Sequence, residues 1–367
     1  MRIIQSLLGA ITIINGFKSL KILANNISNN SNHVISLSGS STSNTKICNN
    51  VISGNTGYII RNLKDMTRLI ICDNLVYNNK NNILFKVYYN VSNTIISRNK
   101  IINNSNVIIG YISNGNLLID NNIICNNKIK NCSEGYKYEE SLFIIEKYDS
   151  VNITLKNNTI YQNFSDINHY LISFYPTQSS IFDIFPPKLI IFLNNNIIYS
   201  RFISLKSEGF IKQAYFYNNN MKYTFTSDKI VIDKGNFNSD PLFINPSDDN
   251  FHLKPNSPCI DSGYNEAISL TETDMDGNSR ISNGIVDIGA YEYSTSDKHP
   301  ADTNENWIIE IEEFTAYNVS WKNAETWTKG PNPIPSEFLT RSGFLLKKGG
   351  RYKNVGLPKP LCWMPDR

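Results

Sequence analysis

An asparagine-marked repeat in the first two-thirds of the chain constrains the fold more than any other feature. The repeat reads φ-x-φ-x-x-N-x-φ-x-x-N, where φ is mostly aliphatic. Its first asparagines are Asn25, Asn50, Asn74, Asn99, Asn122, Asn158, Asn196 and Asn219. They are 25, 24, 25, 23, 36, 38 and 23 residues apart. Five steps therefore equal one coil, and two equal a coil plus an insertion of about a dozen residues.

Apolar residues flank every marker asparagine. Three residues before the markers lie Ile22, Ile47, Ile71, Ile96, Ile119, Leu155, Leu193 and Phe216. Two residues after them lie Ile27, Ile52, Val76, Ile101, Ile124, Ile160, Ile198 and Met221. Because side chains alternate along a strand, this odd separation of five requires a bend at the asparagine. Asparagine suits a bend because it tolerates left-handed backbone, and its amide can bond the equivalent amide about 4.8 Å along the stack.

This pattern predicts an all-β fold, a right-handed parallel β-helix (solenoid) followed by a small C-terminal module with some α-helix. A leucine-rich repeat is the alternative, but L-x-x-L-x-L spacing is missing. The chain resembles right-handed parallel β-helix repeat proteins of bacterial surfaces and secretions over residues 10–293. We expect repeats over 1–234, a closing segment over 235–293, a linker over 294–300 and the module over 301–367.

Composition limits the partners and the compartment. The formal charge is +3 over 367 residues, and no basic stripe forms, so we expect no nucleic-acid partner. No run reaches the roughly 18 apolar residues of a membrane span. The first ten residues could be a signal peptide, or residues 11–16 could already belong to a coil of a chain that lacks its true beginning. Cys48 and Cys72 share a column, where a disulfide is conceivable and two free thiols are expected.

The closing segment, residues 235–293, resembles the segment that follows many such β-helices. The resemblance rests on Asp240-Pro241-Leu242-Phe243, Phe251-His252-Leu253, Asn256–Gly263, Asp274–Asn278 and Val286–Glu292. We expect it to cover the open end of the stack. Asp274 and Asp276, with Asp287 and Glu292, could bind calcium, but turn chemistry is the expected role. His252 is expected to point outward from a strand.

The module contains a loop with EF-hand-like spacing, followed by a predicted helix bearing Phe314, Tyr317 and Trp321 on one face. The loop resembles one calcium half-site of dockerin-type modules, which implies calcium as a cofactor. The implied ligands are Asp302, Asn304, Asn306, Ile308, Glu310 and Glu313. Trp307 replaces the expected glycine, the second loop of a pair is missing, and Asp302 could merely cap the helix. Ser336 and Glu337 open a second predicted helix that could stop at Gly343.

For function, we expect a secreted or cell-surface binding or structural element whose partner is a polysaccharide or another surface component. The alternative is a polysaccharide lyase or glycoside hydrolase of the pectate-lyase-like class. Those enzymes cluster carboxylates, whereas Asp73 and Asp120 stand in different columns. Insertions near 131–148 and 164–188 carry aromatics that could stack on sugars or cover the coils, namely Tyr136, Tyr138, Tyr170, Phe174 and Tyr175.

Overall fold

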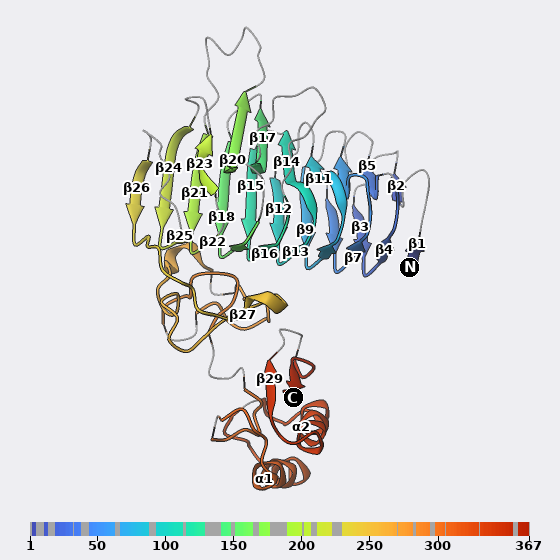
Figure 1. Cartoon of the computed structure of the whole chain (residues 1–367), viewed down its shortest axis with the longest axis vertical. Helices are drawn as coiled ribbons and strands as arrows, with labels where there is room; N and C mark the ends of the chain where they lie inside the picture. Colours follow the sequence, from blue (N-terminus) through green and yellow to red (C-terminus); the bar gives the residue numbers. More distant parts are fainter. Residues whose placement is uncertain are drawn as a thin grey trace.

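The computed structural model shows a long row of strands, stacked from side to side in Figure 1, with two smaller regions below it. The described residues are 2–4, 11–13, 19–31, 33–37, 44–62, 67–87, 93–112, 115–128, 141–147, 151–163, 169–176, 189–199, 202–206, 211–221, 230–269, 271–281, 284–293, 298–304, 306–329, 331–354 and 359–366.

Three long sheets build the stack. Sheet A contains β1 (Arg2–Ile4), β4 (Asn26–Ser28), β7 (Val51–Ser53), β10 (Leu75–Tyr77), β13 (Lys100–Ile102), β16 (Ile123–Cys125), β19 (Thr159–Tyr161), β22 (Ile197–Tyr199) and β25 (Asn220–Met221). Sheet B contains β2 (Ile11–Ile13), β5 (Ile35–Leu37), β8 (Ile60–Asn62), β11 (Lys80–Val87), β14 (Ser105–Ile112), β17 (Ser141–Lys147), β20 (His169–Pro176) and β23 (Phe202–Lys206). Sheet C contains β3 (Leu20–Leu23), β6 (Thr45–Cys48), β9 (Leu69–Cys72), β12 (Asn93–Ser97), β15 (Gly115–Asp120), β18 (Val151–Lys156), β21 (Leu189–Asn194), β24 (Ile211–Tyr217) and β26 (Ile230–Lys234).

The chain visits sheets A, B and C in turn, and each strand pairs in parallel with its equivalent one coil away. This arrangement is consistent with a parallel β-helix. The prediction of a mainly β fold with parallel sheets is confirmed. All sixteen apolar residues that flank the marker asparagines are buried in one hydrophobic cluster. The alternation seen in the sequence therefore separates the core from the outer faces of the sheets.

The marker asparagines form a continuous ladder of amides at the corner between sheets C and A. The Asn74 Nδ2 donates to Asn99 Oδ1 at 2.9 Å and to the Ile47 carbonyl at 2.8 Å. The backbone N–H and Nδ2 of Asn50 both donate to Asn74 Oδ1, at 2.9 and 3.0 Å. Asn74 is 2% exposed, so these bonds replace water for an otherwise costly buried amide.

The residue before each marker asparagine, and not the marker itself, has left-handed backbone geometry. The repeat pattern predicts both the left-handed bend and the amide ladder at the marker, and the first of these predictions is wrong. The residues with positive φ at this corner are Ala24, Asn49, Asp73, Arg98, Asn121, Asn157, Asn195 and Asn218. The bend therefore needs two consecutive residues. The first turns the chain, and the second directs its amide inward to the ladder.

A second ladder runs along the corner between sheets A and B, at the last asparagine of the repeat pattern. It comprises Asn30, Asn55, Asn79, Asn104, Asn127 and Asn163. The Asn79 Nδ2 donates to Asn104 Oδ1 at 2.9 Å and to the Ile52 carbonyl at 3.0 Å. Both corners are thus held by the same interaction, which fixes the register of sheet A at both ends.

Cys48 and Cys72 form a disulfide between neighbouring coils, so the expectation of two free thiols is wrong. The two Cα atoms are 4.6 Å apart because the residues are register partners in β6 and β9. That separation lies within the range that a disulfide can span. The described cysteines Cys125, Cys259 and Cys362 are buried and belong to no disulfide.

Parts of both expected insertions form strands of sheet B, namely β17 and β20. Tyr136 and Tyr138 lie outside the described residues. Tyr170, Phe174 and Tyr175 belong to β20, where the backbone but not their side chains is described. Both roles considered for them, covering the coils and stacking on sugars, therefore stay predictions.

The closing segment contains β27 (Phe243–Asn245), η1 (Pro246–Asp248), β28 (Asn250–Leu253) and η2 (Asn265–Ala267). Phe251 and Ile288 share a hydrophobic cluster with Ile123 and Ile197, which lie in strands of sheet A. Gly289 has φ +109°, and an added Cβ would lie 2.6 Å from the Ile197 side chain. These contacts run along the side of the coils. At the open end, Phe237 is the parallel bridge partner of Asn220 in β25, the last strand of sheet A, and Asn236 extends the ladder beyond Asn219.

The module contains α1 (Ile311–Lys322), α2 (Ser336–Lys347), β29 (Tyr352–Asn354) and β30 (Trp363–Pro365). Tyr317 of α1 is fully buried, whereas Trp321 is 39% exposed and does not join it in the core. The second helix continues past Gly343 to Lys347, contrary to the predicted stop. Gly343 faces the Phe314 ring of α1 and leaves room for it.

We predict that Asn74→Leu lowers the free energy of unfolding by roughly 1–3 kcal/mol, because its partners Asn50 and Asn99 lose buried hydrogen bonds. Asn26→Leu, at an exposed position of β4, is the matched control. Urea unfolding measures both variants. Equal stability of the two variants would contradict the ladder as a stabilising element.

We also predict that reducing the Cys48–Cys72 disulfide lowers unfolding free energy by roughly 3 kcal/mol, because the bond closes a loop with a sequence separation of 24 residues. Guanidinium unfolding with and without reductant measures the change. The Cys48→Ala/Cys72→Ala double variant should show no response to reductant. An equal response in that variant would place the effect elsewhere.

Candidate functional site

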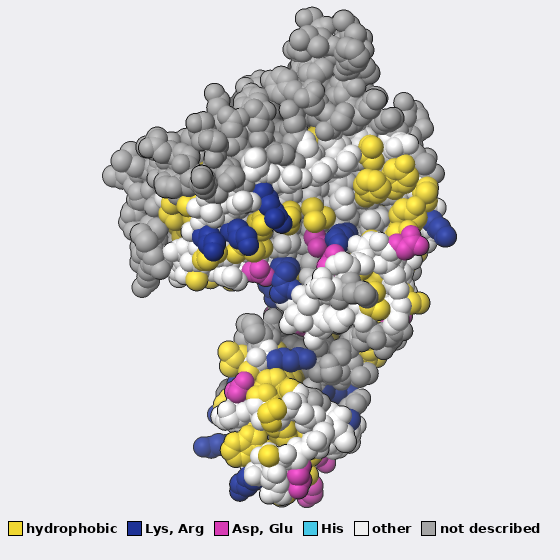
Figure 2. Space-filling model, turned by 180° about the vertical axis from the view of Figure 1, so that it is seen from behind, with side chains coloured by type: hydrophobic (Ala, Val, Ile, Leu, Met, Phe, Trp, Pro, Cys, Tyr) yellow, Lys and Arg dark blue, Asp and Glu magenta, His cyan; other side chains and the backbone are white. Residues whose placement is uncertain are grey.

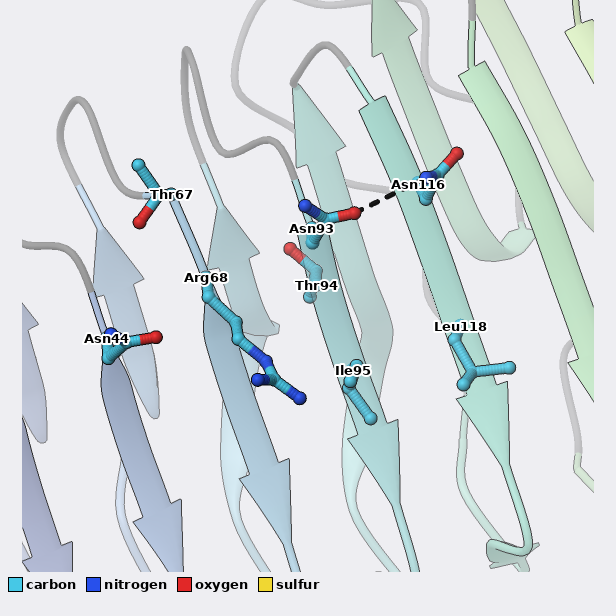
Figure 3. A pocket seen from close by; sticks show the side chains of 8 residues that line it. All are labelled: Asn44, Thr67, Arg68, Asn93, Thr94, Ile95, Asn116 and Leu118. Atoms are coloured by element: carbon cyan, nitrogen blue, oxygen red, sulfur yellow. Dashed lines mark hydrogen bonds between the residues drawn. The ribbon is translucent and has the colours of Figure 1, made fainter.

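An open groove of about 510 Å³ lies on the outer face of sheet C (Figure 3). It is lined by Asn44, Thr67, Arg68, Asn93, Thr94, Ile95, Asn116 and Leu118. In Figure 3 these residues lie on the neighbouring strands β6, β9, β12 and β15 or just before them. Sequence reasoning missed the groove because its side chains carry no motif of their own.

Strand register aligns the polar groups of the groove in one line, here called the polar column. The polar column comprises Asn44, Arg68, Asn93, Asn116 and Asn152, all exposed. The Asn116 Nδ2 donates to Asn93 Oδ1 at 3.3 Å. Because neighbouring strands are about 4.8 Å apart, hydrogen-bonding groups recur at that interval along the face.

A second line of outward side chains, the central column, runs beside the polar column, two residues further along each strand. It comprises Lys21, Lys46, Ile70, Ile95, Leu118, Thr154, Phe192 and Tyr215. Figure 2 shows Lys and Arg side chains towards the N-terminal coils on this side and hydrophobic ones further along. The groove therefore combines amides with a strip of apolar surface.

The charge of these two columns is positive. Lys21 of β3, Lys46 of β6 and Arg68, just before β9, are exposed. From β3 to β24, the described positions of the two columns contain no Asp or Glu. A field of one sign attracts ligands of opposite charge, and here that charge is negative.

Asp120 lies next to the central column, two residues beyond Leu118 on β15, and its carboxylate is engaged in an ion cluster. Lys156 Nζ lies 2.7 Å from Glu272 Oε2 and 4.0 Å from Asp120 Oδ2. Burial raises the pKa of Asp120, against the opposing charge of Lys156. Since Lys156 also donates to the Ala267 carbonyl, this cluster attaches the closing segment to the coils.

Arg98, which belongs to a second ion pair, also attaches the closing segment to the coils. Arg98 donates to Asp73 Oδ1 at 2.7 Å, to Thr273 Oγ1 at 3.0 Å and to the carbonyl of Asp274. Asp73 and Asp120 are therefore each paired with a cation. Sequence reasoning missed these contacts because Arg98 and Thr273 lie 175 positions apart.

His252 is 1% exposed, so the expectation that it points outward is wrong. Its Nδ1 lies 2.6 Å from Asn250 Oδ1 and its Nε2 lies 2.7 Å from Asp276 Oδ2, while its ring stacks on Tyr291. Burial opposes ionisation of Asp276, yet the bond to His252 holds the pKa of that carboxyl below its usual value. His252 thus joins two parts of the closing segment.

The remaining acids of the closing segment also have structural partners. Asp274 Oδ1 accepts the backbone N–H groups of Asp276 and Asn278, at 2.9 and 2.8 Å, which confirms the predicted turn chemistry. Burial raises the pKa of Asp287 to about 6 and that of Glu292 to about 9. Among the described residues, no three His, Cys, Asp or Glu side chains converge as a metal site.

The EF-hand-like loop of the module folds tightly around its own side chains. Asp302 Oδ1 accepts the N–H of Asn306 at 3.1 Å, and Oδ2 accepts that of Trp307 at 2.9 Å and the Tyr352 hydroxyl at 2.7 Å. Trp307 has φ +66°, the conformation for which the loop pattern expects glycine. Asp302 thus does more than cap a helix.

Glu310 and Glu313 close the other side of this loop. They form a capping box at the start of α1, in which Glu313 Oε2 accepts the Glu310 N–H at 3.1 Å. Glu313 Oε1 accepts the N–H groups of Thr303 and Asn304, at 2.8 and 3.1 Å. The predicted ligands Asn304 and Asn306 contact Glu310, and Ile308 bridges to Arg351. The six predicted ligand residues therefore lie together in one compact loop.

No protein family, curated protein sequence or solved structure matches this chain. Neither helix in the described part of the chain is long and apolar enough to cross a membrane.

Proposed function

We propose that this protein is a secreted or cell-surface right-handed β-helix that binds a polysaccharide along the outer face of sheet C. The observation that carries the proposal is the polar column, which offers amides and one guanidinium at even spacing beside an apolar strip. A polymer of repeating sugars presents hydroxyl groups and apolar ring faces at regular intervals. Both features can be matched by side chains repeated along a sheet.

The charge of the groove favours an acidic polysaccharide. Arg68 lies in the groove, and Lys21 and Lys46 extend the positive surface towards the N-terminal coils. Arginine can bind a carboxylate through two parallel hydrogen bonds. The proposed ligand therefore carries carboxylate or sulfate groups on an extended chain.

The alternative, a polysaccharide lyase or glycoside hydrolase, has less support. A hydrolase needs two carboxylates that flank the scissile bond, and a lyase of this class needs carboxylates that hold calcium. The described positions of the polar and central columns offer none of these, and Asp120 is paired with Lys156. Binding without cleavage is the function we favour.

We predict that the protein binds polygalacturonate or alginate, and that Arg68→Ala weakens binding about tenfold, the factor expected for one lost charge-assisted contact. Lys80→Ala, which removes an exposed cation from sheet B, should leave affinity unchanged. Affinity electrophoresis and calorimetry measure both variants. Equal affinities of wild type and Arg68→Ala for each glycan would refute the groove as the site.

The same preparations should release neither unsaturated products nor reducing ends in the presence of calcium. Absorbance of unsaturated sugars and a reducing-end assay measure this over long incubation. Reproducible turnover that disappears when an acidic residue of the coils is changed would instead support the lyase or hydrolase alternative.

We also propose that the loop from Asp302 to Glu313 binds calcium. The specific observation is its turn, in which Trp307 adopts the left-handed geometry of an EF-hand-like loop despite its bulk. Oxygen atoms of Asp302, Asn304, Asn306, Ile308, Glu310 and Glu313 would hold the ion. Glu313 would have to exchange its present backbone hydrogen bonds for the metal, which favours weak binding.

Calcium should change the tryptophan fluorescence of the full chain with a dissociation constant of roughly 10⁻⁴ to 10⁻³ M. All four tryptophans lie between 307 and 363, so the signal reports on the module alone. Glu313→Gln should abolish the response, whereas Glu312→Gln, at an exposed position of α1, should retain it. Unaltered fluorescence and thermal stability at several times that calcium range would eliminate the site.

A further inference from the structure

Four aromatic side chains gather at the far end of the outer face of sheet C. Phe192 of β21 and Tyr215 of β24 are register partners in the central column, with ring centroids 4.9 Å apart and planes 8° apart. Tyr217 lies two residues further along β24 and so shares the outer face with Tyr215. Its ring stacks on Tyr264 of the closing segment, with centroids 4.4 Å apart and planes 7° apart.

These four residues, here called the aromatic platform, are not part of the core. All four are partly exposed, and none belongs to the three hydrophobic clusters of the described residues. Figure 2 shows hydrophobic side chains gathered on this side of the coils, away from the row of Lys and Arg. Large rings held in parallel near the surface retain apolar faces that a ligand can cover.

Polar groups border the platform on the same strands. Gln213 precedes Tyr215 on the outer face of β24, and the exposed Lys234 of β26 is the register partner of Tyr217. An amide can bond sugar hydroxyls, and an ammonium group can pair with a carboxylate. Glu266, which accepts the Tyr264 hydroxyl, adds a carboxylate to this border. The chemistry is that of a sugar, whose ring face is apolar and whose substituents are polar or charged.

We infer that the aromatic platform is a second sugar-binding site, on which the apolar face of a pyranose ring of an acidic polysaccharide stacks. The inference rests on the polysaccharide binding proposed above and specifies the length of its ligand. Strand β24 of the platform lies five strand positions from β9, and Arg68 immediately precedes β9. At about 4.8 Å per strand, one ligand must extend roughly 24 Å to engage both sites.

This distance selects a polymer over a short oligosaccharide. The polar column and the central column run between the two sites on the same face, through β12, β15 and β18. An extended chain lying along them would contact Arg68 at one end and the platform at the other. A second contact on a linked ligand raises overall affinity without any change at the first.

The test compares long-chain polygalacturonate with a galacturonate trisaccharide, which is too short to span both sites. For wild type, the polymer should bind more tightly than the trisaccharide. Tyr215→Leu should weaken polymer binding about tenfold and leave trisaccharide binding unchanged. Tyr215→Phe, which keeps the ring, should bind the polymer like wild type, and Arg68→Ala should weaken both ligands.

Thermal unfolding of the same variants separates binding from a purely structural role. If Tyr215→Leu lowers the melting temperature but leaves polymer affinity unchanged, the platform only stabilises the sheet and the inference fails, while Arg68→Ala still tests the groove. If wild type binds neither ligand, the proposed function and this inference both fail. Equal weakening of polymer and trisaccharide by Tyr215→Leu would also overturn the two-site arrangement.

Discussion

The buried amide ladder is the interaction on which the rest of the structure depends. The side chain of each inner marker asparagine donates to the asparagine of the next coil and accepts from that of the previous coil. Each of these buried amides therefore has hydrogen-bond partners. A slip of one residue would break these bonds and would also turn the apolar side chains outward. The ladders therefore fix the register of sheet A beside the corners, whereas some strand pairs of sheets B and C shift register.

A fixed register has a functional consequence on the outer faces. The closing segment covers part of sheet A through Phe251 and Ile288. The outer face of sheet C keeps an open groove, in which equivalent side chains recur from strand to strand. A binding surface for a repetitive polymer can thus arise from the same repetition that builds the core, although the two faces carry different residue types.

The closing segment links the two faces. Glu272 binds Lys156 beside the central column, and Tyr264 supplies one ring of the aromatic platform. Both residues belong to residues 264–272 of the closing segment, which contact the border of sheet C. Its ion pairs are partly buried, so they are screened less by salt than exposed pairs. The segment therefore both attaches to the coils and shapes the candidate site.

The sequence by itself determined the coils, because residues such as Ile47, Ile71 and Ile96 recur at one-coil spacing and equivalent positions in a parallel stack share a face. It also placed the EF-hand-like loop, whose proposed ligands are neighbours in the chain. Only the tertiary structure decided which outward columns stay uncovered, that Cys48 and Cys72 are joined, and that Glu272 meets Lys156. Contacts between residues 116 positions apart leave no local periodic signal, since they depend on how the closing segment folds back on the coils.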